Sequence, residues 1–404
     1  MKIALVTQYF WPEVTSCALR VDSFVEAWTE RGHDVQVITA VPNHPEGIVH
    51  PDYRGRLTVR ETRHTATVTR VWVKVSPRRS ALNRLMAYGS FAASSAIVGA
   101  TGIERPDVVV ATSPPPIAAL TGRLLAWRYR VPYVLDIRDL WPEAAVAIGE
   151  LREGGSVAQL ISRAMDSLYH SADLVTAATE GFARSIGPDT VVITNGADSR
   201  VATATPADGA ATRRQLGLED KFVVGYVGNH GVCEGLEGVV DAARLLADEP
   251  SVHVLLVGGG PRREQLLARA AGLTNITMHP PVPVEQVGSY LQAADVLMVP
   301  LRNEPHFGTR FPAKLFDAWA CAKPVLIGYD GEARRLAEAT GSGTFAPSDE
   351  PDALSKEIRR LQEIDPGTLA EMGRSGQQWV LANATRAAVA HTFAEHLERL
   401  VRDR

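Results

Sequence analysis

The sequence predicts an α/β protein with two Rossmann-like domains, each built on a parallel sheet. Short apolar runs alternate with helical patterns along the chain, which is typical of repeated strand–helix units. Each half opens in the same way, with a strand, a loop and a helix. The 404 residues suffice for two or three domains with large cores.

The expected strands are short apolar runs rich in β-branched residues. In the first half they cover residues 3–7, 35–39, 68–75, 108–112, 133–137, 174–177 and 191–193. In the second half they cover residues 223–227, 252–257, 276–278, 296–299 and 325–327. The helices expected between them cover residues 18–31, 117–129, 157–171, 236–247, 262–271, 284–293 and 315–322.

A domain boundary is predicted at residues 199–214, where small polar residues with little periodicity are typical of a linker. The first domain then covers residues 1–198 and the second residues 215–379. A helical tail, about residues 380–404, has no strand after it and is expected to join the first domain. Ligands are expected in a cleft between the two domains, because such sheets usually bind at their strand C-termini.

Composition excludes several classes of protein. With 45% hydrophobic residues, 22% charged residues and a net charge of −4, nothing supports non-specific nucleic-acid binding. Three widely spaced cysteines, Cys17, Cys233 and Cys321, form neither a disulfide framework nor a zinc site, which favours a reduced, cytoplasmic enzyme. The N-terminus resembles a buried strand and not a signal peptide. No stretch approaches the roughly 18 apolar residues of a membrane span, so membrane contact is expected to be peripheral.

The helix predicted to begin near Pro312 offers an anion site. Pro312 suits a first helical turn, where its missing N–H costs nothing. Lys314 lies beside the free amides, at the positive end of the helix dipole, where a cation is disfavoured unless an anion binds. Asp317 lies on the same face and suits a sugar diol. Gly308 and the close-packed residues around this K-x-x-D favour a nucleotide-diphosphate site over the alternative, a surface Lys–Asp pair.

Glycines crowd two strand ends of the second half. Gly228, Asn229, His230 and Gly231 follow one strand, where glycine permits close approach of backbone to ligand. Gly258 and Gly259 belong to a three-glycine run whose neighbour is a ligand or a helix, and we favour the ligand. Val282, in a proline-rich loop, is a candidate for presenting backbone groups to a base, although a structural loop is the alternative.

The first strand leads into a long loop without G-x-G-x-x-G, so a dinucleotide fingerprint is absent. Its small residues Thr15, Ser16 and Cys17, with Arg20 on the following helix, would admit a substrate or phosphate. A merely packed aromatic loop is an equal alternative. Asn43 and His44 follow another strand, although a lone histidine is more often structural.

The densest charged cluster of the first domain follows the strand 133–137 and contains Asp136, Arg138, Asp139 and Glu143. Such charges are costly at an inner strand end unless they are paired or used. Either Arg138 forms a structural pair with an aspartate, or the cluster is functional.

Two motif classes are missing, and one segment bears on membranes. No cluster with metal-ligand spacing stands out, and the G-x-x-x-x-G-K-S phosphate loop is absent. In residues 77–91, Arg78, Arg79 and Arg84 border an apolar stripe. This segment either rests on an anionic membrane or lipid-linked acceptor, or packs on the sheet.

Over nearly its full length the chain resembles glycosyltransferase family 4 of the two-domain GT-B fold, in particular the bacterial fucosamine-transferase and colanic-acid-transferase-like subgroup. The matching segments are QYFWPE (8–13), RGHDVQVIT (31–39), PNHPEG (42–47), DYRGR (52–56), RDLWPE (138–143), NGAD (195–198), GN (228–229) and residues 312–324. The segments RDLWPE and PNHPEG are much more specific than the others.

The resemblance implies retaining, metal-independent transfer from a nucleotide sugar, with the donor in the second domain and the acceptor in the first. The family's paired glutamates fall on Thr309 and Asp317, so the first is missing and the second is shortened. Its arginine and lysine diphosphate clamps fall on Asn229 and Glu234, and its frequent cleft histidine on Arg138. Lys314 and Arg310 are therefore expected to carry more of the phosphate charge.

The sequence and this resemblance predict a cytoplasmic glycosyltransferase with peripheral membrane contact. It is expected to transfer a hexose or N-acetylhexosamine-type sugar from a UDP-sugar, to need no cofactor or metal, and to act on a lipid-linked or small-molecule glycan. The catalytic candidates are Asp139, Arg138 and Lys314. The donor candidates are Gly228, Asn229, His230, Gly231, Gly258, Gly259, Val282, Thr309, Arg310, Phe311, Lys314 and Asp317. The acceptor candidates are Thr15, Ser16, Cys17, Arg20, Asn43 and His44. A GT-B nucleotide-sugar epimerase and a non-catalytic binding module remain alternatives, while the missing fingerprint disfavours a dehydrogenase.

Overall fold

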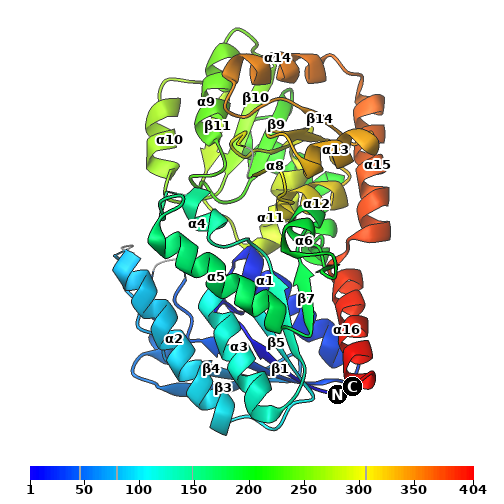
Figure 1. Ribbon diagram of the computed structural model, residues 1–404. Coiled ribbons are helices and arrows are strands. Elements are labelled where there is room, and N and C mark those ends of the chain that lie inside the picture. Colours follow the sequence, from blue (N-terminus) through cyan, green and yellow to red (C-terminus); the bar gives the residue numbers. More distant parts are fainter. Residues whose placement is uncertain (45–46, 79–80, 148, 305–306) are drawn as a thin grey trace. The chain divides into compact units, whose positions relative to one another are not determined.

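A computed structural model describes residues 1–44, 47–78, 81–147, 149–304 and 307–404 of the chain. The chain divides into two compact units, each with its own α/β sheet (Figure 1). Unit 1 comprises Met1–Thr194 and Arg386–Arg404, and unit 2 comprises Asn195–Thr385. Within the described ranges, no helix is both long and apolar enough to cross a membrane.

The described residues of unit 1 form an eight-stranded sheet in the order β3-β4-β2-β1-β5-β6-β7-β8. The strands are β1 (Lys2–Val6), β2 (Asp34–Ala40), β3 (Thr58–Arg63), β4 (Ala66–Val71), β5 (Val108–Ser113), β6 (Tyr133–Ile137), β7 (Leu174–Ala177) and β8 (Val191–Val192). Neighbouring strands are parallel except β3 and β4, which form an antiparallel edge pair. The parallel order brings the C-terminal ends of β1, β5 and β6 to one edge of the sheet.

Successive side chains along each strand point to opposite faces of this sheet, and each face packs against its own layer of helices. Leu5 packs in the cluster that contains α1 and α16, whereas Ala4 and Val6 pack in the cluster with α2, α3 and α5. Figure 1 shows these two layers on opposite faces of the unit 1 sheet. The helices are α1 (Ser16–Glu30), α2 (Ala81–Thr101), α3 (Pro116–Tyr129), α4 (Glu143–Ala147), α5 (Ser156–Ser171), α6 (Glu180–Ile186) and α16 (Arg386–Arg402), with a 3₁₀ turn η1 (Pro51–Tyr53).

Helix α16 returns to unit 1 because it completes the apolar layer beside α1. The Phe393 ring lies edge-on to Phe24 and Trp28, with ring centroids 5.2 and 5.4 Å apart. All three side chains are buried. A chain that stopped before α16 would therefore leave two large rings of α1 exposed.

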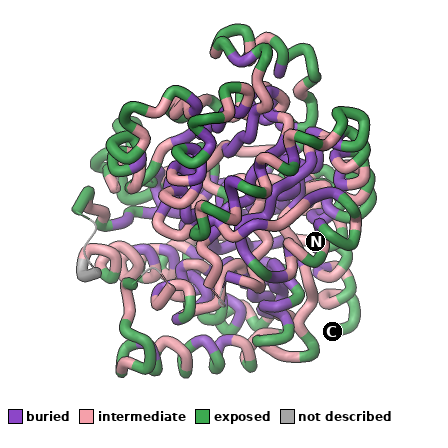
Figure 2. Tube along the Cα trace, turned by 90° about the horizontal axis from the view of Figure 1, so that it is seen from above, coloured by how far each residue is buried: buried purple, intermediate pink, exposed green. Residues whose placement is uncertain are grey.

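The described residues of unit 2 form a six-stranded parallel sheet in the order β11-β10-β9-β12-β13-β14. The strands are β9 (Phe222–Val227), β10 (Val252–Val257), β11 (Ile276–His279), β12 (Val296–Val299), β13 (Val325–Ile327) and β14 (Gly343–Phe345). The helices are α7 (Ser199–Ala202), α8 (Pro206–Leu216), α9 (Leu236–Leu245), α10 (Arg263–Ala270), α11 (Val284–Gln292), α12 (Ala313–Ala320), α13 (Glu332–Ala339), α14 (Pro351–Gln362) and α15 (Pro366–Asn383). Figure 2 shows the strands as buried segments under helices that carry the exposed positions.

The linker prediction is wrong. Residues 199–214 fold into α7 and most of α8, and both helices belong to unit 2. Thr205 and Asp208 form a capping box at the start of α8. Gly209 packs so closely on Gln292 of α11 that an added Cβ would collide with its backbone. Small residues are needed for this contact, and they gave the segment the composition of a linker.

The expected boundary residues also shift. Residues 195–198 belong to unit 2 and not to the first domain, and residues 380–383 belong to α15 of unit 2. Two strands were not predicted. The edge strand β3, with sequence TVRETR, has three charged residues among its six, which suit an edge and hide its pattern. The strand β14 has only three residues.

Candidate functional site

The start of α12 places Lys314 over the glycine-rich loop that follows β9. Pro312 is the N-cap and Ala313 the first helical residue. The Lys314 Nζ lies 3.9 Å from Oε1 of Glu234 and 5.3 Å from the centroid of the Tyr226 ring. An added Cβ at Gly228 would collide with the Lys314 side chain. Lys314 and Gly228 are both donor candidates from the sequence, and unit 2 brings them into contact.

The loop after β9 is held by the loop after β10. The amide of Gly228 donates to Val257, and the amide of His230 donates to Gly259, at 2.9 and 2.8 Å. An added Cβ at Gly258 would collide with the carbonyl oxygen of Gly228, and one at Gly260 would meet Asn229 and His230. The predicted crowding is therefore real, but the neighbour in this structure is the adjacent loop. Gly258 and Gly259 therefore pack against the loop after β9.

Asn229 and Gly231 complete the turn. The Tyr226 hydroxyl donates to the carbonyl oxygen of Asn229 at 2.5 Å. The Asn229 amide nitrogen and the Glu234 carboxylate both approach the α-carbon side of Gly231, where a Cβ would not fit. Glu234 is almost buried. The pKa of Tyr226 is raised, mainly because the hydroxyl is buried and to a smaller extent because Glu234 is near.

His230 is buried completely within this loop. Neither ring nitrogen has a hydrogen-bond partner among the described residues. Burial, with smaller effects of Arg263 and Lys314, lowers the pKa of His230 to about 4. The imidazole is therefore neutral at pH 7.

Asp317, the predicted ribose acceptor, also has a partner within unit 2. Its carboxylate accepts the amide of Asp198 at 3.0 Å, and the Asn195 side chain donates to the carbonyl oxygen of Phe311 at 3.1 Å. The NGAD segment thus braces the start of α12 and the residues before it. This contact explains why the two segments matter together, since 119 residues separate Asp198 from Asp317.

The remaining donor candidates surround the same helix start or lie on a neighbouring loop. Thr309, Arg310 and Phe311 are half-buried in the approach to α12. The Arg310 guanidinium lies 5.0 Å from the Phe307 ring centroid, and the Arg310 carbonyl oxygen accepts from the Tyr329 hydroxyl at 2.9 Å. Val282 is half-buried in the loop before α11.

In unit 1, the N-terminus of α1 lies beside the charged cluster after β6. Thr15 is the N-cap, and its hydroxyl accepts the amide of Ala18 at 3.0 Å. Arg138 donates to the Ser16 hydroxyl at 3.4 Å. Burial acts to lower the pKa of Arg138, but the neighbouring Cys17, Asp139 and Asp136 outweigh it and raise the pKa. The Nε of Arg138 has no hydrogen-bond partner among the described residues. The predicted catalytic and acceptor candidates are thus neighbours.

Arg20, a predicted acceptor-binding residue, is buried and bound to other residues of unit 1. It is 3% exposed, and its guanidinium donates to Asp136, which is 0% exposed, at 3.1 Å. It also donates to the carbonyl oxygens of Ile193, at 2.6 Å, and of Thr194. The buried pair of this cluster is therefore Arg20–Asp136, and not a pair made by Arg138. Arg20 joins α1 to β6 and to the end of β8.

Glu13 was missed by sequence reasoning and connects two predicted segments. Its nearly buried carboxylate accepts the amides of Asn43 and His44 at 2.8 and 2.9 Å. Burial raises the pKa of Glu13, and the two amides oppose that shift. Pro45 of the same motif lies outside the described residues. A cavity of about 310 Å³ opens beside these residues and is walled in part by Pro12 and Ile48.

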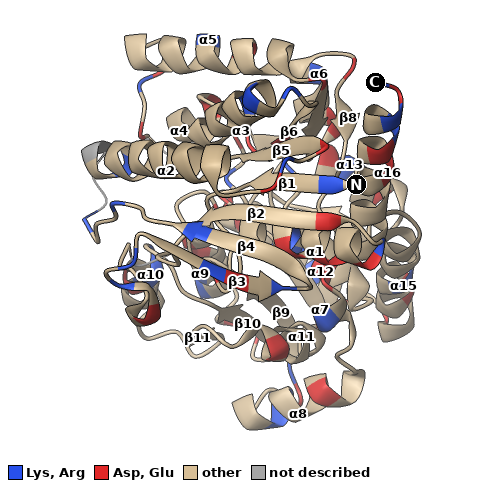
Figure 3. Ribbon diagram, turned by 90° about the horizontal axis from the view of Figure 1, so that it is seen from below, with Lys and Arg blue, Asp and Glu red and all other residues tan. Residues whose placement is uncertain are grey.

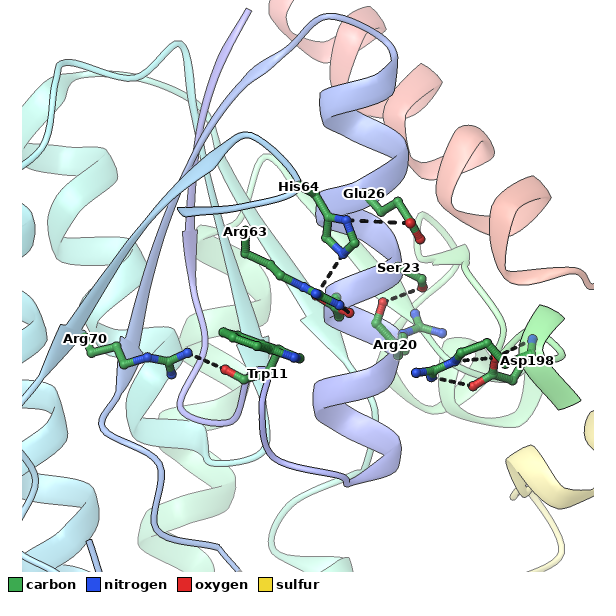
Figure 4. A network of polar contacts seen from close by, with 10 residues as sticks. Trp11, Arg20, Ser23, Glu26, Arg63, His64, Arg70 and Asp198 are labelled. Atoms are coloured by element: carbon green, nitrogen blue, oxygen red, sulfur yellow. Dashed lines mark hydrogen bonds and ion pairs between the residues drawn. The ribbon is translucent and has the colours of Figure 1, made fainter. Parts of the chain in front are cut away.

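A second network, also missed, fixes the loop around Trp11. Arg70 is buried, pairs with Glu61 and donates to the carbonyl oxygen of Trp11. Figure 4 shows Arg70 pointing at the main chain of Trp11, and His64 pointing at Glu26 of α1. The Arg63 guanidinium lies 4.8 Å from the Trp11 ring centroid. Partners far apart in sequence make this network, so no local motif indicates it.

The segment predicted to touch a membrane is mostly α2. Phe91 is buried in the unit 1 core, and Arg84 pairs with Glu150. Packing on the sheet, the alternative weighed from the sequence, thus applies to Phe91. Arg79 lies outside the described residues, and Leu85 is exposed.

Metal ligation was not predicted from the sequence. Over the described part of the chain, His, Cys, Asp and Glu side chains form no group of three or more that could hold a metal ion.

Two families match the chain, each over one part of it. The family described as "Glycosyl transferase 4-like domain" matches residues 17–196, and "Glycosyl transferases group 1" matches residues 221–363. The chain is 32% identical over 339 residues to WcaI of Escherichia coli strain K12, whose name describes a glycosyl transferase of colanic acid biosynthesis. This match covers 81% of the chain and 83% of WcaI.

Solved structures share the fold at low identity. Sucrose-phosphate synthase of Thermosynechococcus elongatus matches with a TM-score of 0.77 and 20% identity, over 100% of both chains. HepE of Anabaena, solved in complex with UDP, matches with a TM-score of 0.73 and 21% identity, over 99% of this chain and 100% of HepE. The prediction of a GT-B fold with two parallel α/β sheets is confirmed.

Proposed function

Because the chain belongs to the group 1 glycosyltransferases, also called family 4, we propose that it is a retaining enzyme that uses a UDP-sugar and needs no metal. Membership of this family makes the chain a glycosyltransferase that moves a sugar from a nucleotide sugar. The observation that carries the finer proposal is the contact between Lys314, at the start of α12, and Gly228 of the loop after β9.

The donor's diphosphate would bind where this contact is made. The α12 amides, the Lys314 ammonium and the backbone of residues 228–231 would share its charge, as donors at a helix start do for bound anions. As the sugar leaves, negative charge builds on the diphosphate, and these fixed groups would stabilise it. Asp317 would accept hydrogen bonds from the ribose hydroxyls.

Unit 1 would bind the acceptor near the N-terminus of α1. Ser16 and Cys17 lie beside Arg138, and Asp139 follows it directly. We propose that Asp139 orients the acceptor hydroxyl and that Arg138 holds a polar or anionic group of the acceptor. Arg20 would act indirectly, because its guanidinium is bound to Asp136 and to two carbonyl oxygens. Asn43 and His44, beside the 310 Å³ cavity, would line a further part of the acceptor site.

The choice of UDP rests on HepE, a structural relative solved with UDP. The choice of acceptor rests on WcaI, whose name refers to colanic acid biosynthesis. We therefore propose a role in polysaccharide biosynthesis, with a lipid-linked or small-molecule glycan as acceptor. Three free cysteines fit a reducing, cytoplasmic location.

We further propose that unit 1 rests on an anionic membrane through the outward faces of α2, α3 and α5. Leu124 and Trp127 of α3 are exposed, as are Leu160 of α5 and Ile97 of α2. Figure 3 shows α2 with few charged positions, and its sequence contains one charged residue, Arg84. Exposed Arg123 and Arg128 beside Trp127 give this face the charge that anionic lipids attract.

A panel of nucleotide sugars tests the proposed function. The melting temperature of the purified chain should rise with one of the UDP-, GDP- or dTDP-sugars, because a ligand stabilises the state that it binds. UDP-sugars are expected to give the largest shift, and sugar transfer should survive excess EDTA. Activity lost to EDTA and restored by Mg²⁺ would contradict the metal-independent proposal.

The same panel separates the alternatives. A nucleotide-sugar epimerase would convert the donor without an acceptor, whereas a transferase should show only slow hydrolysis. A non-catalytic module would bind a donor without turnover of any kind. Binding of none of the three donor classes would contradict the donor site itself.

A further inference from the structure

Two histidines of unit 2 are buried to similar extents but differ in their contacts. His253 of β10 is 6% exposed, and its Nε2 lies 2.9 Å from the Thr277 hydroxyl. His230 is 0% exposed, yet both of its ring nitrogens lack a partner among the described residues. A buried donor or acceptor without a partner costs about 1–3 kcal/mol, so an unsatisfied native group calls for an explanation.

The surroundings of His230 indicate an anion as the missing partner. Lys314 of α12 and Arg263 of α10 both exert positive charge on the ring. Tyr226 of β9 lies on one side, with ring centroids 6.1 Å apart, and its hydroxyl is already bound to Asn229. Glu234, the acid of this loop, lies 3.9 Å from the Lys314 ammonium. The loop after β10 adds glycines beside the ring. Arg262 at the end of this loop donates its amide to the His230 carbonyl oxygen at 3.0 Å, and its guanidinium lies 3.8 Å from Glu237.

We propose that His230 binds the donor's diphosphate directly by donating a ring N–H to a phosphate oxygen. This inference rests on the proposed donor site and adds a ligand that the family's arginine and lysine clamps do not include. A diphosphate that pairs with Lys314 would draw it from Glu234 and from its position across Gly228. The Lys314 side chain would then no longer cover Gly228, and the buried His230 ring would face the bound diphosphate across the loop after β9.

Proton uptake follows from the charges. Without an anion, burial and the two cations keep the pKa of His230 near 4. A bound diphosphate places negative charge and a hydrogen-bond acceptor beside the ring, which opposes both burial and the two cations and raises the pKa of His230 toward its ordinary value of about 6.5. The complex therefore binds more protons than the free protein between about pH 4 and pH 6.5. Donor affinity must rise as the pH falls through this window, by at most about tenfold per pH unit.

Calorimetric titration with UDP-glucose between pH 5 and pH 8 tests this inference. UDP-glucose is chosen because its diphosphate is a diester that does not titrate in this range, whereas the terminal phosphate of UDP does. The wild-type chain should bind more tightly at pH 5.5 than at pH 7.5. His230→Phe should weaken binding about tenfold and abolish the pH dependence. His230→Gln, which keeps an N–H donor, should recover part of the affinity without the pH dependence.

Matched measurements exclude a merely structural histidine. His230→Phe should leave the melting temperature unchanged or higher, because an apolar ring replaces an unsatisfied polar one. His253→Phe, the control, should lower the melting temperature and leave both the affinity and its pH dependence intact. Unchanged affinity in folded His230→Phe and His230→Gln would overturn the inference. If the wild-type chain binds none of UDP-, GDP- and dTDP-glucose, the proposed function fails with it.

Discussion

The two candidate regions use buried charge in opposite ways. In unit 1, the buried charges find their partners inside the fold: Arg20 pairs with Asp136, and Arg70 pairs with Glu61. In unit 2, Lys314 and Arg263 both act on the neutral imidazole of His230, and Glu234 reaches only 3.9 Å from Lys314. In unit 1 the charges are therefore paired before any ligand binds, whereas in unit 2 an anion would neutralise positive charge.

This difference indicates which residues should affect stability and which should affect binding. Removing one member of a buried pair leaves the other charge without compensation, so unit 1 substitutions should act on folding. Removing a cation from a region with excess positive charge costs the fold little and weakens anion binding. Each prediction below tests one side of this comparison.

The largest expected effect is on stability. Arg20→Ala leaves Asp136 buried without its cation and should lower the free energy of unfolding by about 3–5 kcal/mol. Chemical denaturation of the full chain measures this loss. The control Arg31→Ala breaks a partly exposed pair with Glu398 and should have a much smaller effect. Equal effects of the two substitutions would show that burial does not distinguish the pairs.

The next effect is on turnover. If Asp139 orients the acceptor hydroxyl, Asp139→Asn should lower turnover about 10²-fold, within the range for positioned acid–base groups. Donor affinity should hardly change, because the donor candidates lie in unit 2. The control is Asp166→Asn, at an exposed position of α5. A destabilised Asp139→Asn variant with full specific activity would assign Asp139 to the structural frame.

The smallest effect sharpens the account of unit 2. Glu234 competes with a diphosphate for Lys314, so Glu234→Gln should tighten donor binding by up to about fivefold, the scale of a weak ion pair of about 1 kcal/mol. Calorimetry at pH 7.5 measures the change. Glu237→Gln, which loses a 3.8 Å pair with Arg262 on the neighbouring helix, should leave the affinity as it is. Weaker binding by Glu234→Gln would mean that this carboxylate supports the site.

The sequence predicts the sheets better than the connections. Runs such as 133–137 and 252–257 coincide with β6 and β10, because buried parallel strands are mostly apolar. The charged edge strand β3 escapes this pattern, since an edge needs polar residues. The helix α8 has the composition of a linker, because its packing on α11 requires small residues.

For the candidate sites, local motifs single out Lys314 and the loop 228–231, and the structure places Lys314 against Gly228. They could not find Glu13, whose amide partners lie about 30 residues away, or the partner of Arg20, which lies 116 residues away. They also could not tell that Gly258 packs on Gly228. Such contacts depend on strand order and register, which a single sequence does not contain.

The central claim is that the start of α12 and the loop after β9 bind the donor's diphosphate. Calorimetric titration of Lys314→Ala with the nucleoside diphosphate that most stabilises the wild-type chain tests it most directly. The loss should be about 1.5–3 kcal/mol, or roughly ten- to hundredfold in affinity, as for a hydrogen bond to a charged group. The control Lys221→Ala, whose side chain donates to the carbonyl oxygen of Pro250, should bind normally. Wild-type affinity in folded Lys314→Ala would contradict the claim.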